Sequence, residues 1–120
     1  MRVMQVSRDD AVPDASVIFI GEVLRQNLVA DADATLLRVT SVTFVNGARN
    51  RWHRHTTDQV LVATAGRGIV ANEQQEWRLS PGNVVLVPAG ERHLHGSEVD
   101  ADFSHLSILT PGEMTIDETP

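Results

Sequence analysis

Short runs of apolar and β-branched residues recur along the chain, and polar turn residues separate them. Residues such as Val, Ile and Thr favour β-strands, and alternating apolar and polar positions are typical of strands with one buried face. No window keeps apolar residues at helical spacing over several turns. The pattern predicts an all-β fold, either a sandwich or a small barrel. The predicted strand runs are residues 16–29, 35–45, 59–65, 69–79, 84–88 and 102–110.

Two of these runs carry apolar residues on both faces. The sequence Val-Val-Leu-Val at residues 84–87 is apolar at both even and odd positions, so both faces of the strand are apolar. This is expected of a strand covered on both sides. In residues 103–109, Leu106 and Ile108 face away from the side that carries His105. Either the N-terminal strand or a second copy of the chain must cover this face. Because homodimers are the commonest soluble oligomers, we expect a homodimer.

The length of 120 residues suits one domain. We therefore expect residues 1–120 to form a single domain, with the first ~15 and the last ~8 residues at its periphery. The longest apolar runs fall short of the ~20 residues that a membrane-spanning helix needs, and the N-terminus lacks a signal-peptide core. These features predict a cytoplasmic protein that does not enter a membrane.

Composition and charge narrow the function further. The chain has no cysteine, so any metal ion must be held by nitrogen and oxygen atoms, and thiol chemistry is excluded. A net charge of −6 opposes binding to nucleic acid, and we expect a small-molecule substrate instead. Arg49, Arg51 and Arg54 form a basic cluster beside two histidines. This cluster is either a solvated rim or an attractor for small anionic substrates.

Four of the five histidines form two His-x-His pairs. His53 and His55 are two positions apart, so in a strand they point to the same side, close enough for both imidazoles to meet one ion. Gln59 shares their parity. Asp58 is an alternative ligand if the strand register slips by one residue, although its parity aims it away from the two histidines.

His93 and His95 form the second pair, in a strand entered through the turn at residues 88–90, and His105 faces inward on the last predicted strand. All five histidines can therefore converge on one barrel interior. Neutral imidazole favours Zn, Cu, Ni, Fe and Mn over Mg and Ca, and an amide or carboxylate oxygen completes such a set. The alternative is that these histidines are ordinary hydrogen-bonded residues of a core.

The spacing of these residues resembles the first of two motifs of the cupin superfamily. That motif runs Gly, five residues, His-x-His, three or four residues, Glu, six residues, Gly. Gly47, His53, His55, Gln59 and Gly66 occupy these places here, with glutamine in place of glutamate.

The second motif of the family runs Gly, five residues, Pro-x-Gly, two residues, His, three residues, Asn. The chain matches it with Gly82, Pro88, Gly90 and His93, and Ser97 stands at the place of Asn. Together the two motifs span residues 47–97. The resemblance implies a cupin-type double-stranded β-helix, which is a jelly-roll barrel.

The resemblance also implies that His53, His55, Gln59 and His93 hold one divalent transition metal, with Mn or Fe favoured and Zn or Ni as alternatives. Glutamine at position 59 is similar to a group of small cupins that includes manganese-dependent hydroxynitrile lyases. A neutral carboxamide leaves the full charge on the ion, which makes the ion a stronger Lewis acid that favours small anions or a polarised substrate oxygen.

Because Gln59 cannot accept a proton, His95 and His105 are the catalytic candidates for moving one. Their alternative role is hydrogen bonding within the core. Leu109 stands where hydroxynitrile-lyase-like relatives tend to carry glutamine, which argues against cyanohydrin chemistry but not against the metal site. The residues expected to line a mostly apolar substrate pocket are Thr40, Val42, Phe44 and Leu109.

We therefore expect a mononuclear-metal enzyme that acts on a small organic molecule through lyase-like activation of a substrate oxygen. Oxygen-dependent oxidation of the dioxygenase type is the alternative reaction. A binding or sensing module without turnover, and a metal that only braces the barrel, are the alternatives from other classes of function.

Overall fold

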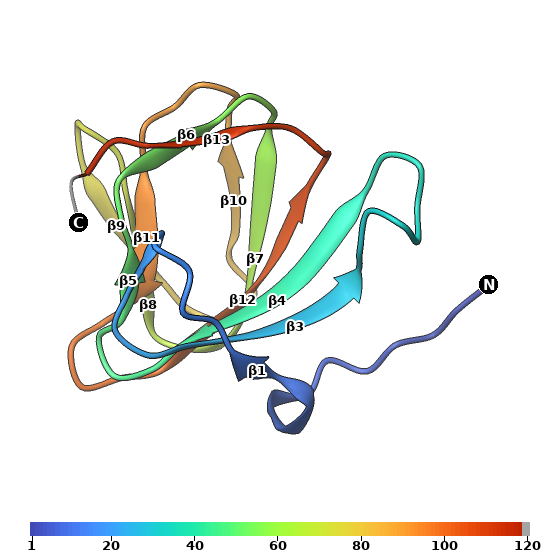
Figure 1. The fold of residues 1–120 in the computed structure, drawn as a ribbon. Helices are drawn as coiled ribbons and strands as arrows, with labels where there is room; N and C mark the ends of the chain where they lie inside the picture. Colours follow the sequence, from blue (N-terminus) through green and yellow to red (C-terminus); the bar gives the residue numbers. More distant parts are fainter. Residues whose placement is uncertain (119–120) are drawn as a thin grey trace.

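Two antiparallel sheets curve around a common interior in the computed structural model, which describes residues 1–118 (Figure 1). A third, two-stranded sheet lies across one end of the barrel (Figure 1). The predicted all-β fold, a jelly-roll barrel, is confirmed. Within residues 1–118, no helix has the length and apolar character needed to cross a membrane.

The order of the strands in the sheets differs from their order in the sequence. β12, from near the end of the chain, lies in the middle of the larger sheet between β4 and β7. Along the six-stranded sheet the strands are β1 (Val12–Pro13), β3 (Val23–Val29), β4 (Arg38–Phe44), β12 (Phe103–Leu109), β7 (Gln59–Gly66) and β10 (Val84–Val87). Along the five-stranded sheet they are β2 (Phe19–Ile20), β5 (Arg49–Asn50), β11 (Leu94–Ser97), β8 (Gly68–Ala71) and β9 (Glu76–Leu79). The remaining elements are β6 (His53–His55), its partner β13 (Met114–Ile116) and a short 3-10 helix, η1 (Arg8–Asp10).

The register of the larger sheet sets which side chains share its inner face. His105 of β12 lies opposite Val42 of β4. Further along β12, Leu109 lies opposite Arg38 of β4 on one side and Gln59 of β7 on the other. Side chains directly opposite each other in an antiparallel pair share a face, so Arg38, Leu109 and Gln59 form one row across three strands.

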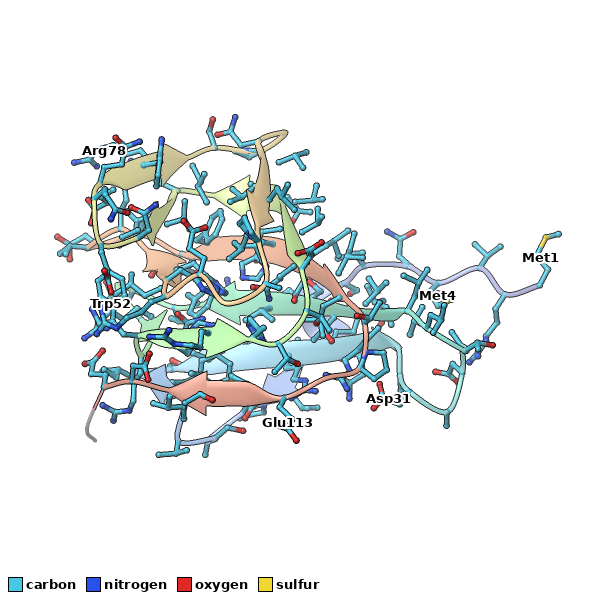
Figure 2. All side chains as sticks on the ribbon, turned by 90° about the horizontal axis from the view of Figure 1, so that it is seen from above. Met1, Met4, Asp31, Trp52, Arg78 and Glu113 are labelled. Carbon is cyan, nitrogen blue, oxygen red and sulfur yellow. The ribbon has the colours of Figure 1, made fainter. Side chains whose placement is uncertain are left out.

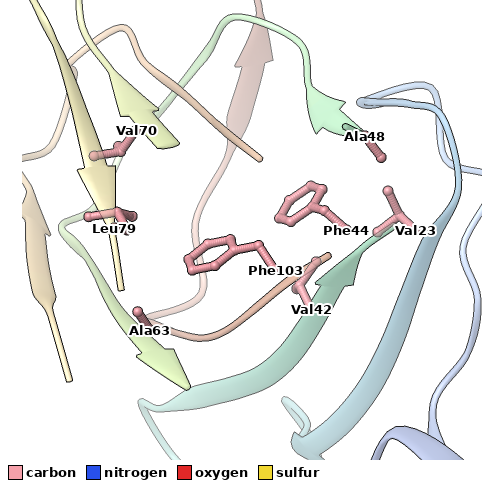
Figure 3. Close-up of a cluster of buried hydrophobic side chains, with 8 residues drawn as sticks. All are labelled: Val23, Val42, Phe44, Ala48, Ala63, Val70, Leu79 and Phe103. Carbon is pink, nitrogen blue, oxygen red and sulfur yellow. The ribbon is translucent and has the colours of Figure 1, made fainter. Parts of the chain in front are cut away.

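Phe44 and Phe103 anchor the hydrophobic core and are 0% and 1% exposed (Figure 3). The ring of Phe44 lies 5.7 Å, between centroids, from the rings of both His95 and His105. The core therefore packs against these two histidines and excludes water from one side of them. The other members of the core cluster are Val23, Val42, Ala48, Ala63, Val70 and Leu79.

The run predicted at residues 69–79 is a hairpin of β8 and β9 instead of a single strand. Asn72 forms the turn, because its side-chain oxygen accepts hydrogen bonds from the backbone N–H groups of Gln74 and Gln75, at 2.9 and 3.0 Å. Short side chains that bond the nearby backbone in this way favour turns over continued strands.

One face of β10 is open to solvent. Val84 and Leu86 are 65% and 63% exposed, so the prediction that residues 84–87 are covered on both faces is wrong within a single chain. β1 pairs with β3, at the edge of the same sheet opposite β10. The outward-facing Leu106 and Ile108 of β12, for which the N-terminal strand or a second copy is the expected cover, are half-buried within the described chain. Ahead of β1, the segment that carries Met1 and Met4 extends away from the barrel (Figure 2).

The described C-terminal residues pair with β6 at the end of the barrel. β13 pairs with β6 in antiparallel register, and the backbone N–H of Asp117 donates to the carbonyl of Trp52 at 2.8 Å. These residues belong to the last ~8, which are expected at the periphery; their backbone is paired, while the side chains of Met114, Thr115 and Asp117 are exposed. Residues 119–120, which that expectation also includes, lie outside the described part of the chain.

Two glycines with left-handed backbone conformations allow a matched test of the packing between β7 and β12. A Cβ at Gly66 (φ +77°) would lie 2.0 Å from the backbone oxygen of Asp102, whereas a Cβ at Gly82 (φ +95°) would meet nothing within 4 Å. We expect Gly82→Ala to lower the free energy of unfolding by ~1 kcal/mol through backbone strain alone. Gly66→Ala should cost ~2 kcal/mol more, because overpacking adds to the strain. Urea unfolding of both variants checks this, and equal losses would contradict the close approach.

Candidate metal centre

His53, His55 and His93 converge at the end of the barrel that β6 crosses. An isolated antiparallel bridge joins His53 to His93, with backbone N–H···O distances of 3.0 and 2.9 Å. One ring nitrogen from each of the three histidines lies within 4.8 Å of the others. His53 and His93 are each only 2% exposed. The structure therefore brings together the three histidines that the sequence pattern assigns to one metal site.

Backbone carbonyls fix the tautomers of two of these rings. The Nδ1 of His53 donates to the carbonyl of Arg51 at 2.7 Å, and the Nδ1 of His93 donates to the carbonyl of Glu91 at 2.9 Å. A carbonyl can only accept, so both Nδ1 atoms carry the proton and both Nε2 atoms keep a lone pair in the neutral ring. The Nε2 of His55 is buried and has no hydrogen-bond partner within residues 1–118.

Gln59 adds an oxygen donor to this cluster. Its side chain is 4% exposed, and its amide nitrogen donates to Ser107 Oγ at 2.8 Å. The amide oxygen then faces His93 Nε2 at 3.2 Å. Both atoms carry lone pairs and could share a cation; without one, a turn of the amide by 180° lets its nitrogen donate to His93 Nε2. Three imidazole nitrogens and one carboxamide oxygen fit a divalent transition-metal ion.

The alternative ligand Asp58 does not join the cluster. Its Oδ1 accepts a hydrogen bond from the backbone N–H of Ala89 at 2.9 Å, on the outside of the barrel. The register expected from parity therefore holds, with Gln59 inside and Asp58 outside.

His95 and His105 form a second, fully buried pair beside the cluster. Asn50 Oδ1 accepts from the backbone N–H of His95, so the amide nitrogen of Asn50 is the atom that donates to His95 Nε2; both distances are 2.9 Å. The proton of His95 is then on Nδ1, which donates to His105 Nε2 at 3.0 Å. In this series of hydrogen bonds the proton of His105 is on Nδ1, which has no partner among the described residues.

Burial keeps these imidazoles uncharged at neutral pH. Desolvation, with added repulsion from neighbouring histidines, lowers the pKa of His53 to about 3, and the same causes together with the charge of Arg38 lower the pKa of His55 to about 4. Desolvation also lowers the pKa of His105 to about 4 and the pKa values of His93 and His95 below 6.5. The neutral form of histidine is the one that binds metal ions and accepts protons.

A cavity of about 250 Å³ is lined by Gln59 and by four of the five histidines, all except His93. Three of the residues predicted to line a pocket, Thr40, Val42 and Leu109, do line it. Phe44 does not line it and lies instead beside His95 and His105 in the hydrophobic core. Lining residues that the sequence analysis did not identify include Arg25, Arg38, Asn50, Ser107 and Met114.

Two of the three arginines of the basic cluster next to β6 are ion-paired. Arg49 donates to both carboxylate oxygens of Glu118, at 3.0 and 2.9 Å, and Arg54 donates to Asp117 at 2.8 Å. Arg51 donates instead to the backbone carbonyl of Val17 at 2.8 Å, which leaves its charge without an ion pair among residues 1–118. Arg49 and Arg54 therefore hold the described C-terminal residues, and of the three only Arg51 keeps a free charge.

Comparisons with known proteins agree with this geometry. The sequence model of the Cupin domain family matches residues 40–109, a segment that contains all five histidines and Gln59. The (R)-mandelonitrile lyase of Granulicella tundricola is 38% identical over 91 residues, which cover 75% of this chain and 70% of that protein.

Two solved structures share the fold. A cupin-like protein of Thermotoga maritima superposes with a TM-score of 0.80 and 32% identity, over 89% of this chain and 86% of that chain. The polyketide cyclase RemF of Streptomyces resistomycificus has a TM-score of 0.83, over 99% of this chain and 88% of that chain. At 13% identity the likeness to RemF concerns the fold alone.

The buried histidines predict that stability rises with pH between about 4 and 6.5. Their pKa values lie below 6.5 in the folded protein, so in this window the unfolded chain binds more protons. The free energy of unfolding should therefore fall as the pH is lowered, by at most ~1.4 kcal/mol per pH unit for each histidine. Urea unfolding of metal-free protein across this range measures the slope.

A His105→Gln variant is the control for this prediction, because it removes one of the contributing groups and should reduce the slope. Carboxylates with lowered pKa values, such as Asp102 and Glu118, add to the same trend at the acid end of the range, so the slope above about pH 5 is the one that reports the histidines. Stability that stays constant from pH 6.5 to pH 4 would contradict the neutral state of the cluster.

Proposed function

The chain belongs to the cupin family, and on this basis we propose that it is a metal-dependent enzyme that acts on a small organic molecule by a lyase-like reaction. The observation that carries the proposal is the cluster of neutral imidazoles and one carboxamide beside a second, hydrogen-bonded histidine pair. The lyase character is supported by the 38% identity to a mandelonitrile lyase.

Four residues would hold the metal: His53, His55, His93 and, through its side-chain oxygen, Gln59. When bound, a divalent ion supplies Lewis acidity toward a substrate oxygen. We propose Mn or Fe as the resident metal, with Zn or Ni as alternatives, because imidazole and amide ligands suit these ions. All four side chains are neutral, so they leave the positive potential of the site available to a polarised or anionic group.

His95 is the proton acceptor in this proposal. Its Nε2 is held only by the Asn50 amide, so a substrate hydroxyl can replace that contact and pass its proton to Nε2. The Nδ1–H bond from His95 to His105 then becomes charge-assisted and stabilises the imidazolium. His105 is a positioning residue, because it fixes the ring of His95. Phe44 packs against both rings and keeps water away from the transferred proton.

Turnover of mandelonitrile to benzaldehyde and cyanide tests the proposal on protein loaded separately with Mn, Fe and Zn. We expect chelation to abolish turnover, and His93→Ala to lose both metal, measured by elemental analysis, and activity. His95→Gln should retain the metal but lower kcat ~10²-fold, because it removes only the proton acceptor.

Other results would replace this reaction with an alternative. Oxygen uptake by the Fe- or Mn-loaded protein, without mandelonitrile turnover, would indicate oxidation. Ligand binding without turnover of any kind would indicate a sensing module. A His93→Ala protein that unfolds as a direct result of metal loss would indicate a structural ion.

We also propose that the protein is a homodimer. The exposed Val84 and Leu86 of β10 lie opposite Val62 and Val60 of β7, so they continue one apolar outer face across the sheet. An apolar sheet face of this kind is typical of an interface with a second copy.

Light scattering on a sizing column tests the dimer. Leu86→Asp should convert it to a monomer. The matched control is Leu36→Asp, in the loop between β3 and β4, where the leucine is 66% exposed against 63% for Leu86. A monomeric parent protein, or equal effects of both variants, would contradict the proposal.

A further inference from the structure

Arg38 lies on the inner row of side chains that leads away from the candidate metal centre. Leu109 separates it from Gln59, and the three residues sit opposite one another on β4, β12 and β7. Adjacent strands are about 4.8 Å apart, so the backbones of Arg38 and Gln59 are roughly 10 Å apart. Arg38 lines the cavity and its side chain is 32% exposed, which places the guanidinium where the cavity meets solvent.

The guanidinium of Arg38 is oriented but not saturated. Its Nε and Nη2 donate to the two carboxylate oxygens of Asp31, each at 2.8 Å. Asp31 is 57% exposed and does not line the cavity. Nη1 has no hydrogen-bond partner among the described residues, so its N–H groups are available to an acceptor that enters the cavity.

The other charges on the cavity wall cancel. Arg25 lies opposite Val42 on the inner face of β3 and lines the cavity. Its Nη1 binds Asp14 at 3.1 Å, and Asp14 is the one acidic side chain within residues 1–118 that lines the cavity. The histidines and Gln59 are neutral. Asp31 offsets the charge of Arg38 in the same way, so what distinguishes Arg38 on the wall is its Nη1, whose N–H groups suit an acceptor such as a carboxylate oxygen.

We propose that the substrate carries a carboxylate that Arg38 binds, while a hydroxyl or carbonyl oxygen at the other end of the same molecule meets the histidine cluster. This inference rests on the proposed function for the identity of the reacting oxygen. The cavity of about 250 Å³ limits the substrate to a small acid, about the size of a substituted benzoate. The apolar side chains of Val42 and Leu109 contact the part of the molecule between its two polar ends.

Calorimetric titration with a matched pair of probes tests the inference. 4-Formylbenzoate has an aldehyde and a carboxylate at opposite ends, and 4-formylbenzamide is its uncharged counterpart. Both are titrated into metal-free and Mn-loaded protein. We expect the acid to bind about tenfold more tightly than the amide in both forms, as for one charge-assisted contact. The preference should weaken as salt is raised, since the guanidinium is partly exposed.

Three variants separate recognition by Arg38 from a structural role. Arg38→Gln should remove the preference for the acid. Arg78→Gln should keep it, because Arg78 is also ion-paired but lies at the other end of the molecule from Asp31 (Figure 2). Asp31→Asn should keep or increase the preference, since it frees more of the guanidinium. If Arg38 served only to brace the loop, Asp31→Asn would instead reproduce the effect of Arg38→Gln.

Equal binding of acid and amide in both forms would overturn the inference. A preference that survives Arg38→Gln but is lost in Arg25→Gln would overturn the assignment to Arg38. Neither result depends on turnover. Failure to take up metal or to turn over mandelonitrile would count against the proposed function, while a charge preference measured on the metal-free protein would still support Arg38 as the carboxylate site.

Discussion

The antiparallel bridge between His53 and His93 is the contact on which the site depends. Two backbone hydrogen bonds join residues from segments far apart in the sequence and bring their rings to 4.2 Å between centroids. The same local backbone supplies the carbonyls of Arg51 and Glu91, which orient both rings. A slip of one residue would turn either His-x-His segment outward. Backbone pairing, rather than side-chain packing, therefore aims the nitrogen atoms.

Burial gives the site its chemical character and also costs the fold stability. Removal of imidazole from water disfavours its charged form, so the rings keep their lone pairs at neutral pH. Two ring nitrogens, His55 Nε2 and His105 Nδ1, are buried without partners among the described residues. Unsatisfied polar atoms of this kind destabilise a protein by ~1–3 kcal/mol each. A ligand that satisfies them stabilises the folded state by mass action.

Strand parity and motif spacing predict most of the fold and the three-histidine cluster, because both depend on a period of two residues that any strand obeys. The same parity places Arg38 in line with Thr40 and Val42, so Arg38 was detectable as a lining residue. Asn50 gave no such signal. It lies in a two-residue strand, and its contacts with His95 arise only from the way β5 approaches β11.

Other features depend on distances that a sequence does not encode. Phe44 has the parity of the pocket residues, but it lies at the depth where the barrel is filled by the core. The partners of Arg49 and Arg54 come from the last described residues, a pairing that local sequence does not reveal. The apolar run of β10 predicts a strand covered on both faces, but apolar character alone does not determine whether a surface covers each face.

The central place of β12 has a consequence for how the barrel assembles. β4 and β7 are joined only through β12, so among the described residues the larger sheet stays divided until residues 103–109 insert between them. Pairings between segments this far apart in the sequence close long loops and form slowly. The row that joins Arg38, Leu109 and Gln59 is therefore a late product of folding, and a chain without β12 in place exposes the inner faces of both halves of the sheet.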